Sequence, residues 1–407
     1  MIQSLPEIFA LPSDQDATGR TFDQVELDYL RQALDSGVLT STKGYFTKTF
    51  ETEFAELLGA KHARACASGS AAIHIAIAAI DPEPGDEIIT TSVTDMGALT
   101  PIIYQGAIPV FADVDPVTLN VTATTIAARI SPKTKAIIVT HLFGNPAPMT
   151  EIMELANKAG IPIIEDTAQA MLATHDGKTL GTIGAIGCFS LQQGKHITTG
   201  EGGVVVTNDP ELDRKMYLYI NKGWGYGDPK PDHYFLALNY RISELQGAVA
   251  LAQLQKLPSV VRRRQNLAAQ FATMIADIPG ISAPKVAPGD ECAFWKYTLY
   301  IDSSIIKGGP VALGKKLGLS KIMTAPRYIV KPAFACAVIR DQKTFGQSHW
   351  PFNLARPEAV DYSPELFPGT FDGLEHCLVL PWNDRYDQGH LLHIERALRE
   401  SVMELMG

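Results

Sequence analysis

Short apolar runs alternate with stretches of helical periodicity along the N-terminal part of the chain. Helical stretches at 124–129 and 149–159 separate several of the runs, which is typical of a mainly parallel sheet covered by helices on both faces. The runs predict strands at 88–91, 109–111, 136–140, 162–165 and 186–191, and an added neighbouring strand at 204–207. Ligands of such sheets bind beyond the carboxyl ends of the strands, so we expect the functional site there.

Two amphipathic helices precede the predicted sheet. Apolar residues recur at helical spacing over 22–36 and over 46–58. A glycine follows each stretch, Gly37 and Gly59, and is a suitable helix stop.

Ser68, Gly69 and Ser70 form a polar turn ahead of an alanine-rich apolar helix. The bare N–H groups and positive dipole end of such a helix start suit an anion. Gly69 allows a close backbone approach, and Ser70 can either cap the helix or bind a phosphate oxygen. Taken alone, these residues favour an ordinary N-cap. His74 lies inside the helical pattern, which favours a packing role.

Polar clusters follow three of the predicted strands, at 140–146, 165–170 and 190–195. Asp166 emerges from an apolar strand and is therefore expected at the rim of the sheet. A carboxylate in that place could hold a protonated ring nitrogen, or it could cap a helix. The local sequence leaves both interpretations open.

Lys195 lies between the predicted strands 186–191 and 204–207, ahead of a glycine-rich segment. A lysine between two buried strands is costly to desolvate unless it has a use. One such use is a Schiff base, because an amine kept neutral can condense with an aldehyde cofactor. A solvated hairpin lysine is the alternative, and this residue by itself favours it.

The pattern changes after the sheet. A glycine-, proline- and aromatic-rich loop leads to Asn239 and Arg241, followed by an amphipathic helix over 242–257. A second helix is expected from the arginine run 262–264 to about 278, with the arginines on a solvated face. We therefore predict a large domain, 1–258, which begins with an irregular arm (1–20), and a smaller C-terminal α/β domain, 259–407.

Composition narrows the class of protein. The formal charge of −9 argues against binding to a nucleic-acid backbone as the main task. The five cysteines are scattered without a C-x-x-C pair, which argues against a disulfide framework and a zinc site, so we expect no metal. Without an apolar run long enough to span a membrane, and without a signal peptide in 1–14, a cytoplasmic location is expected.

Together, these segments resemble the fold-type I, aspartate-aminotransferase-like enzymes that depend on pyridoxal 5′-phosphate (PLP). Within them, the chain is similar to the DegT/DnrJ/EryC1/StrS family, which aminates keto-sugars and ketocyclitols. The resemblance extends from about 22 to 257 and, more loosely, to the C-terminus. Each motif is weak alone, but their order and spacing are specific. The motifs are 67–72, 84–89, 106–115, 141–146, 165–170, 190–203 and 239–246.

The resemblance implies PLP as the cofactor and assigns roles around its ring. Lys195 matches the lysine that forms the Schiff base. Asp166 matches the carboxylate on the pyridine nitrogen, which keeps the ring protonated and makes it an electron sink. Gln169 matches the residue near the phenolic oxygen.

The resemblance also implies a phosphate site and a homodimer. Gly69 and Ser70 match the phosphate cradle at the helix start, and Ser190 matches a hydroxyl on the same phosphate. Asn239 matches a residue that reaches the phosphate from the other subunit. The active site is then shared between two subunits.

The sequence departs from the family pattern at two places. An aromatic residue usually stacks on the pyridine ring soon after 84–89, but Asp95 and Met96 occupy that stretch here. Met96 could cover the ring through its sulfur, and Asp95 could turn towards substrate. The segment from Arg327 to 352 is elongated and, like the glutamine pair at 192–193, resembles the inosose aminotransferase branch. Arg241 and Arg327 are candidates for the donor carboxylate, with a surface salt bridge as the alternative.

The function expected from the resemblance is amino transfer from glutamate or glutamine to a keto-sugar, often nucleotide-linked, or to a ketocyclitol such as an inosose. The kinetics are expected to be ping-pong through pyridoxamine phosphate. One alternative is a PLP-dependent sugar dehydratase, which Lys195 disfavours because such enzymes typically carry histidine there. Another is a non-catalytic protein that binds a sugar nucleotide. A dinucleotide-binding enzyme is disfavoured because no G-x-G-x-x-G follows the first strand.

Overall fold

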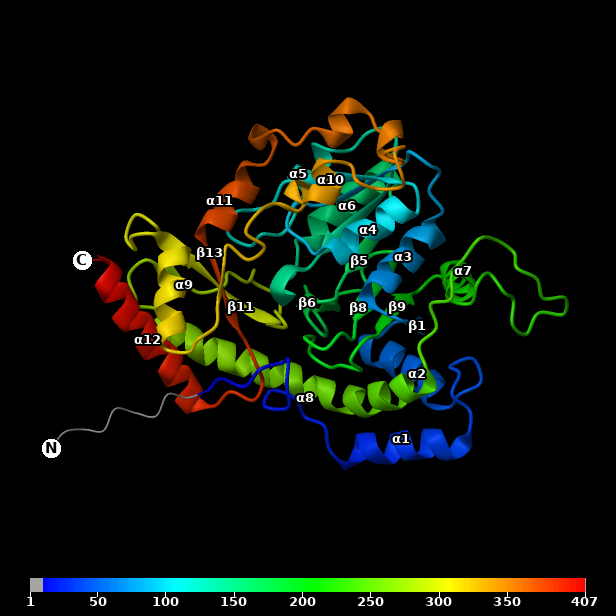
Figure 1. Cartoon of the computed structure of the whole chain (residues 1–407), viewed down its shortest axis with the longest axis horizontal. Coiled ribbons are helices and arrows are strands. Elements are labelled where there is room, and N and C mark those ends of the chain that lie inside the picture. The colour runs from blue at the N-terminus through cyan, green and yellow to red at the C-terminus, as the bar shows by residue number, and fades with distance from the viewer. Residues whose placement is uncertain (1–9, 407) are drawn as a thin grey trace.

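A seven-stranded sheet forms the centre of the protein, and it is mainly parallel, as the sequence predicts (Figure 1). The computed structural model describes residues 10–406, so positions 1–9 of the predicted arm lie outside the described residues. Within this range, β9 runs antiparallel to both of its neighbours, and the other strands share one direction. The spatial order is β1 (His62–Cys66), β9 (Gly203–Thr207), β8 (Ile186–Ser190), β5 (Ile163–Asp166), β4 (Thr134–Thr140), β2 (Glu87–Thr91) and β3 (Ile108–Ala112).

Helices cover both faces of the sheet, because its central strands are apolar on both sides. Ile88 of β2 and Cys188 of β8 belong to one apolar cluster, whereas their neighbours Ile89 and Phe189 belong to another. The first cluster includes residues of α3 (Gly69–Ile80), α4 (Met96–Tyr104) and α7 (Pro210–Ile220). The second includes residues of α2 (Phe46–Leu58), α5 (Ala123–Ala127), α6 (Met149–Ala159) and the first half of α8 (Glu244–Ile275).

The early helices follow the sequence signals closely. α1 (Gln24–Ser36) begins after Asp23, whose side chain accepts from the backbone N–H of Val25, and it ends at Gly37. Gly59 ends α2 in the same left-handed conformation, with φ of 74°. Both helices are therefore confirmed, within two residues at the start of α1.

α8 corrects the prediction of two separate helices. It is continuous over 32 residues although it contains Pro258. Leu257 and Val261 pack in the cluster beneath the large sheet, and Leu267 and Phe271 pack in a third cluster towards the C-terminus. Because apolar contacts continue along the helix on both sides of the proline, one missing backbone hydrogen bond does not break it.

The C-terminal part contains a smaller antiparallel sheet packed with helices. Its order is β10 (Ile281–Ser282), β11 (Lys296–Ile301), β13 (Cys377–Pro381) and β12 (Ala325–Pro326). The second half of α8 packs here with α9 (Gly309–Leu319) and α12 (Gln388–Met406). Figure 1 shows these elements gathered at one end of α8.

A long segment between β12 and β13 returns to the large sheet. Phe334, Phe352 and Phe367 from this segment belong to the apolar cluster around α3 and α4. A domain boundary at 258/259 therefore stays a prediction. The remaining short elements are η1 (Leu142–Gly144), β6 (Thr174–His175), β7 (Lys178–Thr179), η2 (Ala333–Ala335), α10 (Ala337–Arg340), η3 (Phe352–Leu354), η4 (Pro357–Val360), η5 (Pro364–Leu366) and α11 (Pro368–His376).

Arg264 lies in the protein interior, so the prediction of three solvated arginines is wrong for this residue. Its side chain is 0% exposed and donates to Asp14 Oδ1 at 2.8 Å and to the Trp382 carbonyl at 2.6 Å. Arg262, two positions earlier, is exposed. In the stretch 10–406, no helix is both long and apolar enough to cross a membrane.

Replacing Arg264 by alanine should destabilise the protein. The change leaves Asp14 buried without its closest arginine partner, and breaking such a pair costs about 3 kcal/mol or more. Arg262→Ala, on the exposed face of the same turn, should change the free energy of unfolding by less than about 0.5 kcal/mol. Thermal and urea unfolding midpoints of the two variants measure the difference. Equal midpoints would contradict a structural role for the buried arginine.

Candidate active site

A cavity of about 400 Å³ lies at the carboxyl ends of the parallel strands. It brings together most of the residues that the sequence marks as candidates, although they are up to 126 positions apart. The predicted residues that line it are Gly69, Ser70, Asp95, Asp166, Gln169, Ser190 and Lys195. A cavity therefore lies at the edge of the sheet where the sequence predicts the functional site.

Lys195 projects from the turn that follows β8 and faces the cavity. Its ammonium nitrogen lies 4.5 Å from the centroid of the Trp295 ring. Burial lowers the pKa of Lys195 below its usual value, while the charges of Asp166 and Asp95 partly oppose that shift. A lowered pKa increases the fraction of neutral amine, which is the nucleophilic form.

Asp166 ends β5, next to β8 in the sheet. Its carboxylate accepts from the Thr140 hydroxyl at 3.3 Å and from the Ala168 backbone N–H at 3.2 Å. Burial raises the pKa of Asp166, because these few donors and the charge of Lys195 do not replace water fully. A cation placed in the cavity would stabilise the carboxylate. Within 10–406, no helix begins directly at Asp166, because the residues that follow it form turns, so the helix-cap interpretation is wrong.

Glu165, the neighbour of Asp166 on β5, points to the other face of the sheet and fixes the end of the strand through hydrogen bonds. Its carboxylate accepts from the backbone N–H groups of Gly181 and Ile183, each at 2.8 Å. His141 lies 3.1 Å away, and its Nδ1 accepts from the Ala147 N–H, so Nε2 carries the hydrogen that it donates to Glu165. These buried hydrogen bonds hold the strand ends that carry the site.

The start of α3 forms a concave, polar wall of the cavity. Ser68 is the N-cap, since its hydroxyl accepts from the Ala71 N–H at 3.0 Å, so Ser70 lies in the first turn. A methyl group on Gly69 would come within 2.8 Å of Ser190 Cβ. The glycine therefore keeps open a space between a helix N-terminus and a hydroxyl, which fits a phosphate group.

Gln169 is oriented by the backbone, with its Oε1 accepting from the Phe143 N–H at 2.7 Å. This leaves its amide NH₂ available towards the cavity and Tyr328. Burial raises the pKa of Tyr328 to about 12, although a hydrogen bond from Gln169 opposes the shift. The phenol is thus protonated at neutral pH.

Two aromatic residues that the sequence did not identify also line the cavity, Trp295 and Tyr328. Trp295 precedes β11, and Tyr328 follows β12, so both come from the C-terminal part of the chain. Met96 packs instead against the apolar cluster around α3. Asp95 lines the cavity and also caps α4, since its carboxylate accepts from the Gly97 N–H at 2.7 Å. The rings near the site are therefore supplied by long-range contacts.

Three predicted residues lie elsewhere in the single chain. Asn239 is exposed on the segment between α7 and α8, which extends away from the sheet (Figure 1). Arg241 contacts Asn221, and Arg327 forms an ion pair with Glu375 at 3.0 Å. For Arg327, the geometry in this chain is thus the salt bridge that the sequence left as the alternative.

The fold and the site together define a class of protein. The α/β architecture with a mainly parallel sheet is that of PLP-dependent aminotransferases. Solved structures of aminotransferases superpose on nearly the whole of this chain. The cavity holds a lysine, a carboxylate and a helix start of the kind that PLP requires, so the residues present fit this cofactor. The protein is a PLP-dependent aminotransferase.

The chain belongs to the DegT/DnrJ/EryC1/StrS aminotransferase family, whose model matches residues 21–352. GDP-perosamine synthase of Caulobacter vibrioides is 37% identical over 286 residues, which cover 70% of this chain and 76% of that protein. The family predicted from the sequence motifs is confirmed, as is the cofactor.

Solved structures extend the similarity to almost the whole chain. An aminotransferase from Psychrobacter cryohalolentis has a TM-score of 0.84 and 29% identity, over 95% of this chain and 98% of that one. A GDP-4-keto-6-deoxymannose-3-dehydratase with a trapped PLP–glutamate geminal diamine has a TM-score of 0.80 and 25% identity, over 93% and 98% of the two chains. Aminotransferase and dehydratase chemistry therefore both occur on folds similar to this one.

Gly69→Ala should weaken cofactor binding without unfolding the protein. The added methyl group would meet Ser190 and narrow the space at the start of α3. We expect a loss of affinity for PLP of at least about tenfold, equal to about 1.4 kcal/mol, in an absorbance titration of cofactor-free protein. The control is Gly318→Ala in α9, where nothing lies within 4 Å of the added methyl group. Unchanged affinity in Gly69→Ala would contradict the phosphate site.

Proposed function

We propose that this enzyme transfers an amino group from glutamate or glutamine to a keto-sugar or ketocyclitol, in a ping-pong reaction. The observation that carries the proposal is the placement of Lys195 and Asp166 in one cavity with a helix N-terminus. Relatives named GDP-perosamine synthase support a nucleotide-linked sugar as the acceptor. An inosose is the second candidate, on the strength of the elongated segment 327–352.

Lys195 is the residue proposed to hold the cofactor covalently and to move protons. Its lowered pKa supports attack by the neutral amine on an aldehyde carbon, with loss of water. Once an amino donor has displaced it, the same nitrogen can take the proton from the donor Cα as a general base and return it as a general acid. Trp295 over the amine keeps water from that side.

Asp166 is proposed to bind the protonated ring nitrogen. The rise in its pKa that burial causes would be relieved by a cationic partner in the cavity. Bound PLP would supply an electron sink at this place. Gly69, Ser70 and Ser190 would hold the phosphate, and the Gln169 amide would face the phenolic oxygen.

A second subunit is proposed to complete the site through Asn239. The segment that carries this residue also exposes large apolar side chains, with Leu236 93% exposed and Leu238 54% exposed. Apolar residues of α1 are exposed as well, including Leu27 and Leu34. Exposed apolar surface of this kind is typical of an interface, so a homodimer fits the surface.

Asp95, Arg241 and Arg327 are proposed substrate contacts. Asp95 already lines the cavity. The two arginines would have to leave their present partners, Asn221 and Glu375, or act across the dimer. We therefore place Asp95 ahead of them as a contact to the acceptor.

The alternative function is a dehydratase or a non-catalytic sugar-nucleotide binder. The dehydratase of similar fold motivates it. Lys195 disfavours the dehydratase, because dehydratases of this family typically carry histidine at that position. His196 does not take over the role, since its Nε2 donates to the Ala293 carbonyl at 3.0 Å and burial holds its pKa well below the usual range.

With PLP added, the wild-type protein should show a visible absorption band that bleaches with L-glutamate or L-glutamine. Lys195→Ala should lose turnover by at least about 1,000-fold, within the range for a positioned general base. Asp166→Asn should be nearly inactive as well, because the ring nitrogen loses its charged partner. Absorption spectra and steady-state rates measure these effects.

Lys158→Ala, at the exposed end of α6, is the control and should behave as wild type. Near-normal turnover in Lys195→Ala would end the proposed mechanism. A band that ignores both donors would favour the non-catalytic alternative. Assays with a nucleotide-linked 4-keto-sugar and with an inosose separate the two acceptors.

Co-expressed Lys195→Ala and Asn239→Ala subunits should recover activity that neither homodimer has at limiting PLP. In a two-fold dimer, one cavity of the mixed pair receives both changes and the other receives none, so about half the wild-type activity per dimer is expected. Purification through two different tags isolates the mixed dimer. If Asn239 acts within its own subunit, every cavity carries one change and no recovery occurs.

A further inference from the structure

Two side chains from segments outside the large sheet, Arg20 and Trp295, bind the backbone of the turn that carries Lys195. The guanidinium of Arg20 donates to the carbonyl of Lys195 at 2.7 Å and also contacts the carbonyls of Gln193 and His196. The indole N–H of Trp295 donates to the carbonyl between them, that of Gly194, at 2.6 Å. Four successive carbonyls, 193–196, are therefore fixed by two side chains.

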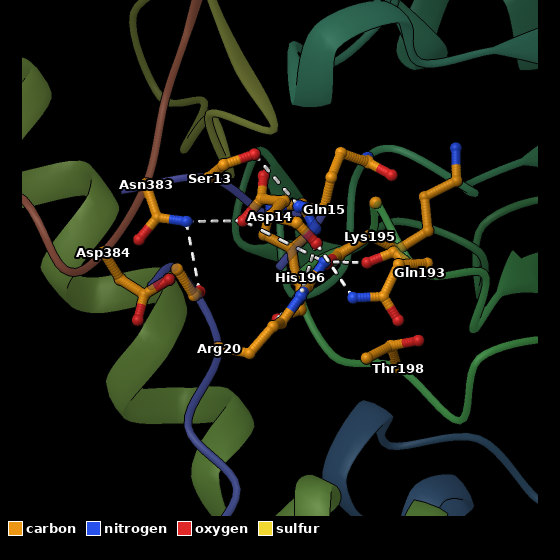
Figure 2. A network of polar contacts seen from close by, with 12 residues as sticks. Ser13, Asp14, Gln15, Arg20, Gln193, Lys195, His196, Thr198, Asn383 and Asp384 are labelled. Atoms are coloured by element: carbon orange, nitrogen blue, oxygen red, sulfur yellow. Dashed lines mark hydrogen bonds and ion pairs between the residues drawn. The ribbon is translucent and has the colours of Figure 1, made fainter. Parts of the chain in front are cut away.

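Arg20 is itself fixed in the interior, with a side chain that is 4% exposed. Its Nε donates to the Asp14 carbonyl at 2.9 Å, and its Nη2 lies 3.9 Å from the Asp14 carboxylate. Figure 2 shows Arg20 between Asp14 and the Lys195 turn, with Asn383 on the far side of Asp14 (Figure 2). The arginine thus joins the N-terminal segment to the turn.

Asp14 is in turn shared by residues from distant parts of the chain. Its carboxylate lies 2.8 Å from Arg264 and 3.5 Å from Lys296, and it accepts from the Asn383 amide at 2.6 Å. A carboxylate with this many donors cannot rotate freely, so Asp14 is held in place, and its backbone carbonyl accepts from Arg20 Nε at 2.9 Å. A buried guanidinium without hydrogen-bond acceptors is destabilising, and here the carbonyls of the turn are its acceptors.

We propose that Arg20 is a positioning residue for Lys195, which fixes the backbone of the turn 193–196 so that the amine stays inside the cavity. The inference rests on the proposed role of Lys195. Arg20 is not among the residues that line the cavity, and it contacts Lys195 at the backbone carbonyl, so it acts through the turn. A lysine side chain has many rotamers, and its backbone must be fixed for the amine to be presented in one place.

The pKa of Lys195 depends on its burial and on the charges around it, so this pKa reports where the amine lies. Asp166 and Asp95 favour the charged amine, Lys296 disfavours it, and burial disfavours it most. Glu201 and Tyr328 also line the same cavity. If the turn is released, water reaches the amine and its pKa rises towards the usual value, because burial is the largest cause of the lowered pKa.

The test compares the pH dependence of Lys195 labelling in cofactor-free, full-length protein. Acetic anhydride labels neutral amines, and mass spectrometry of the peptide that carries Lys195 gives the titration midpoint. Arg20→Gln should raise this midpoint by about one pH unit, a tenfold change in the neutral fraction. Arg20→Lys keeps the charge beside Asp14 but lacks the planar fork, so an intermediate midpoint is expected.

Arg263→Gln is the matched control. Arg263 likewise donates to backbone carbonyls, those of Asp384 and Tyr386, but not to the Lys195 turn. A purely structural role would lower the thermal unfolding midpoint in both the Arg20 and Arg263 variants and leave the Lys195 titration unchanged in both. An unchanged titration in Arg20→Gln, or in Arg20→Lys where only that variant folds, would overturn the proposal.

Failure of the proposed role of Lys195 has a separate readout. Borohydride reduction of the wild-type protein with PLP attaches the cofactor to the lysine that binds it, and peptide mapping identifies that residue. Attachment to another lysine overturns the proposed role of Lys195. The positioning role of Arg20 then has no bearing on catalysis. Attachment to Lys195 together with an unshifted titration in the Arg20 variants overturns the positioning role alone.

Discussion

The structure depends on placing a buried amine and a buried carboxylate at neighbouring strand ends of one parallel sheet. β5 and β8 pair in register at Asp166 and Cys188, so the end of β5 lies beside the turn that carries Lys195. Neither charge is well solvated in this cavity, and burial shifts the pKa of each residue towards its neutral form. The sheet is covered by apolar helices on both faces, which leaves its carboxyl edge as the place where such groups can converge.

The C-terminal part of the chain completes this edge. Trp295 lies over the amine of Lys195, and Tyr328 lies beside Gln169, so the aromatic walls come from segments beyond the large sheet. α8 is continuous between the two apolar regions, which favours a fixed relation between the walls and the sheet. The cavity is therefore shaped by contacts between residues more than a hundred positions apart in the sequence.

Local signals predicted the parts of the fold that are set locally. The helix stops Gly37 and Gly59 and the apolar runs of the central strands are patterns within a few residues, and the meeting of Asp166 and Lys195 follows from a general rule of parallel sheets. The burial of Arg264 could not be predicted in this way, because its partner Asp14 is 250 positions away. The aromatic walls could not be predicted locally either, because Trp295 and Gly194 are about a hundred positions apart. The continuity of α8 depends on apolar packing on both sides of its proline, which is also a long-range effect.

The polar network around Asp14 shows why such long-range contacts come as a set. Each of its members would be costly to bury alone, since an unpaired charge in the interior is destabilising by several kcal/mol. Arg20 and Arg264 both lie within 4 Å of the same oxygen of Asp14, so removing either one changes the surroundings of the other. Contributions of contacting residues are not additive, and the position of the Lys195 turn must therefore be regarded as a property of the whole network.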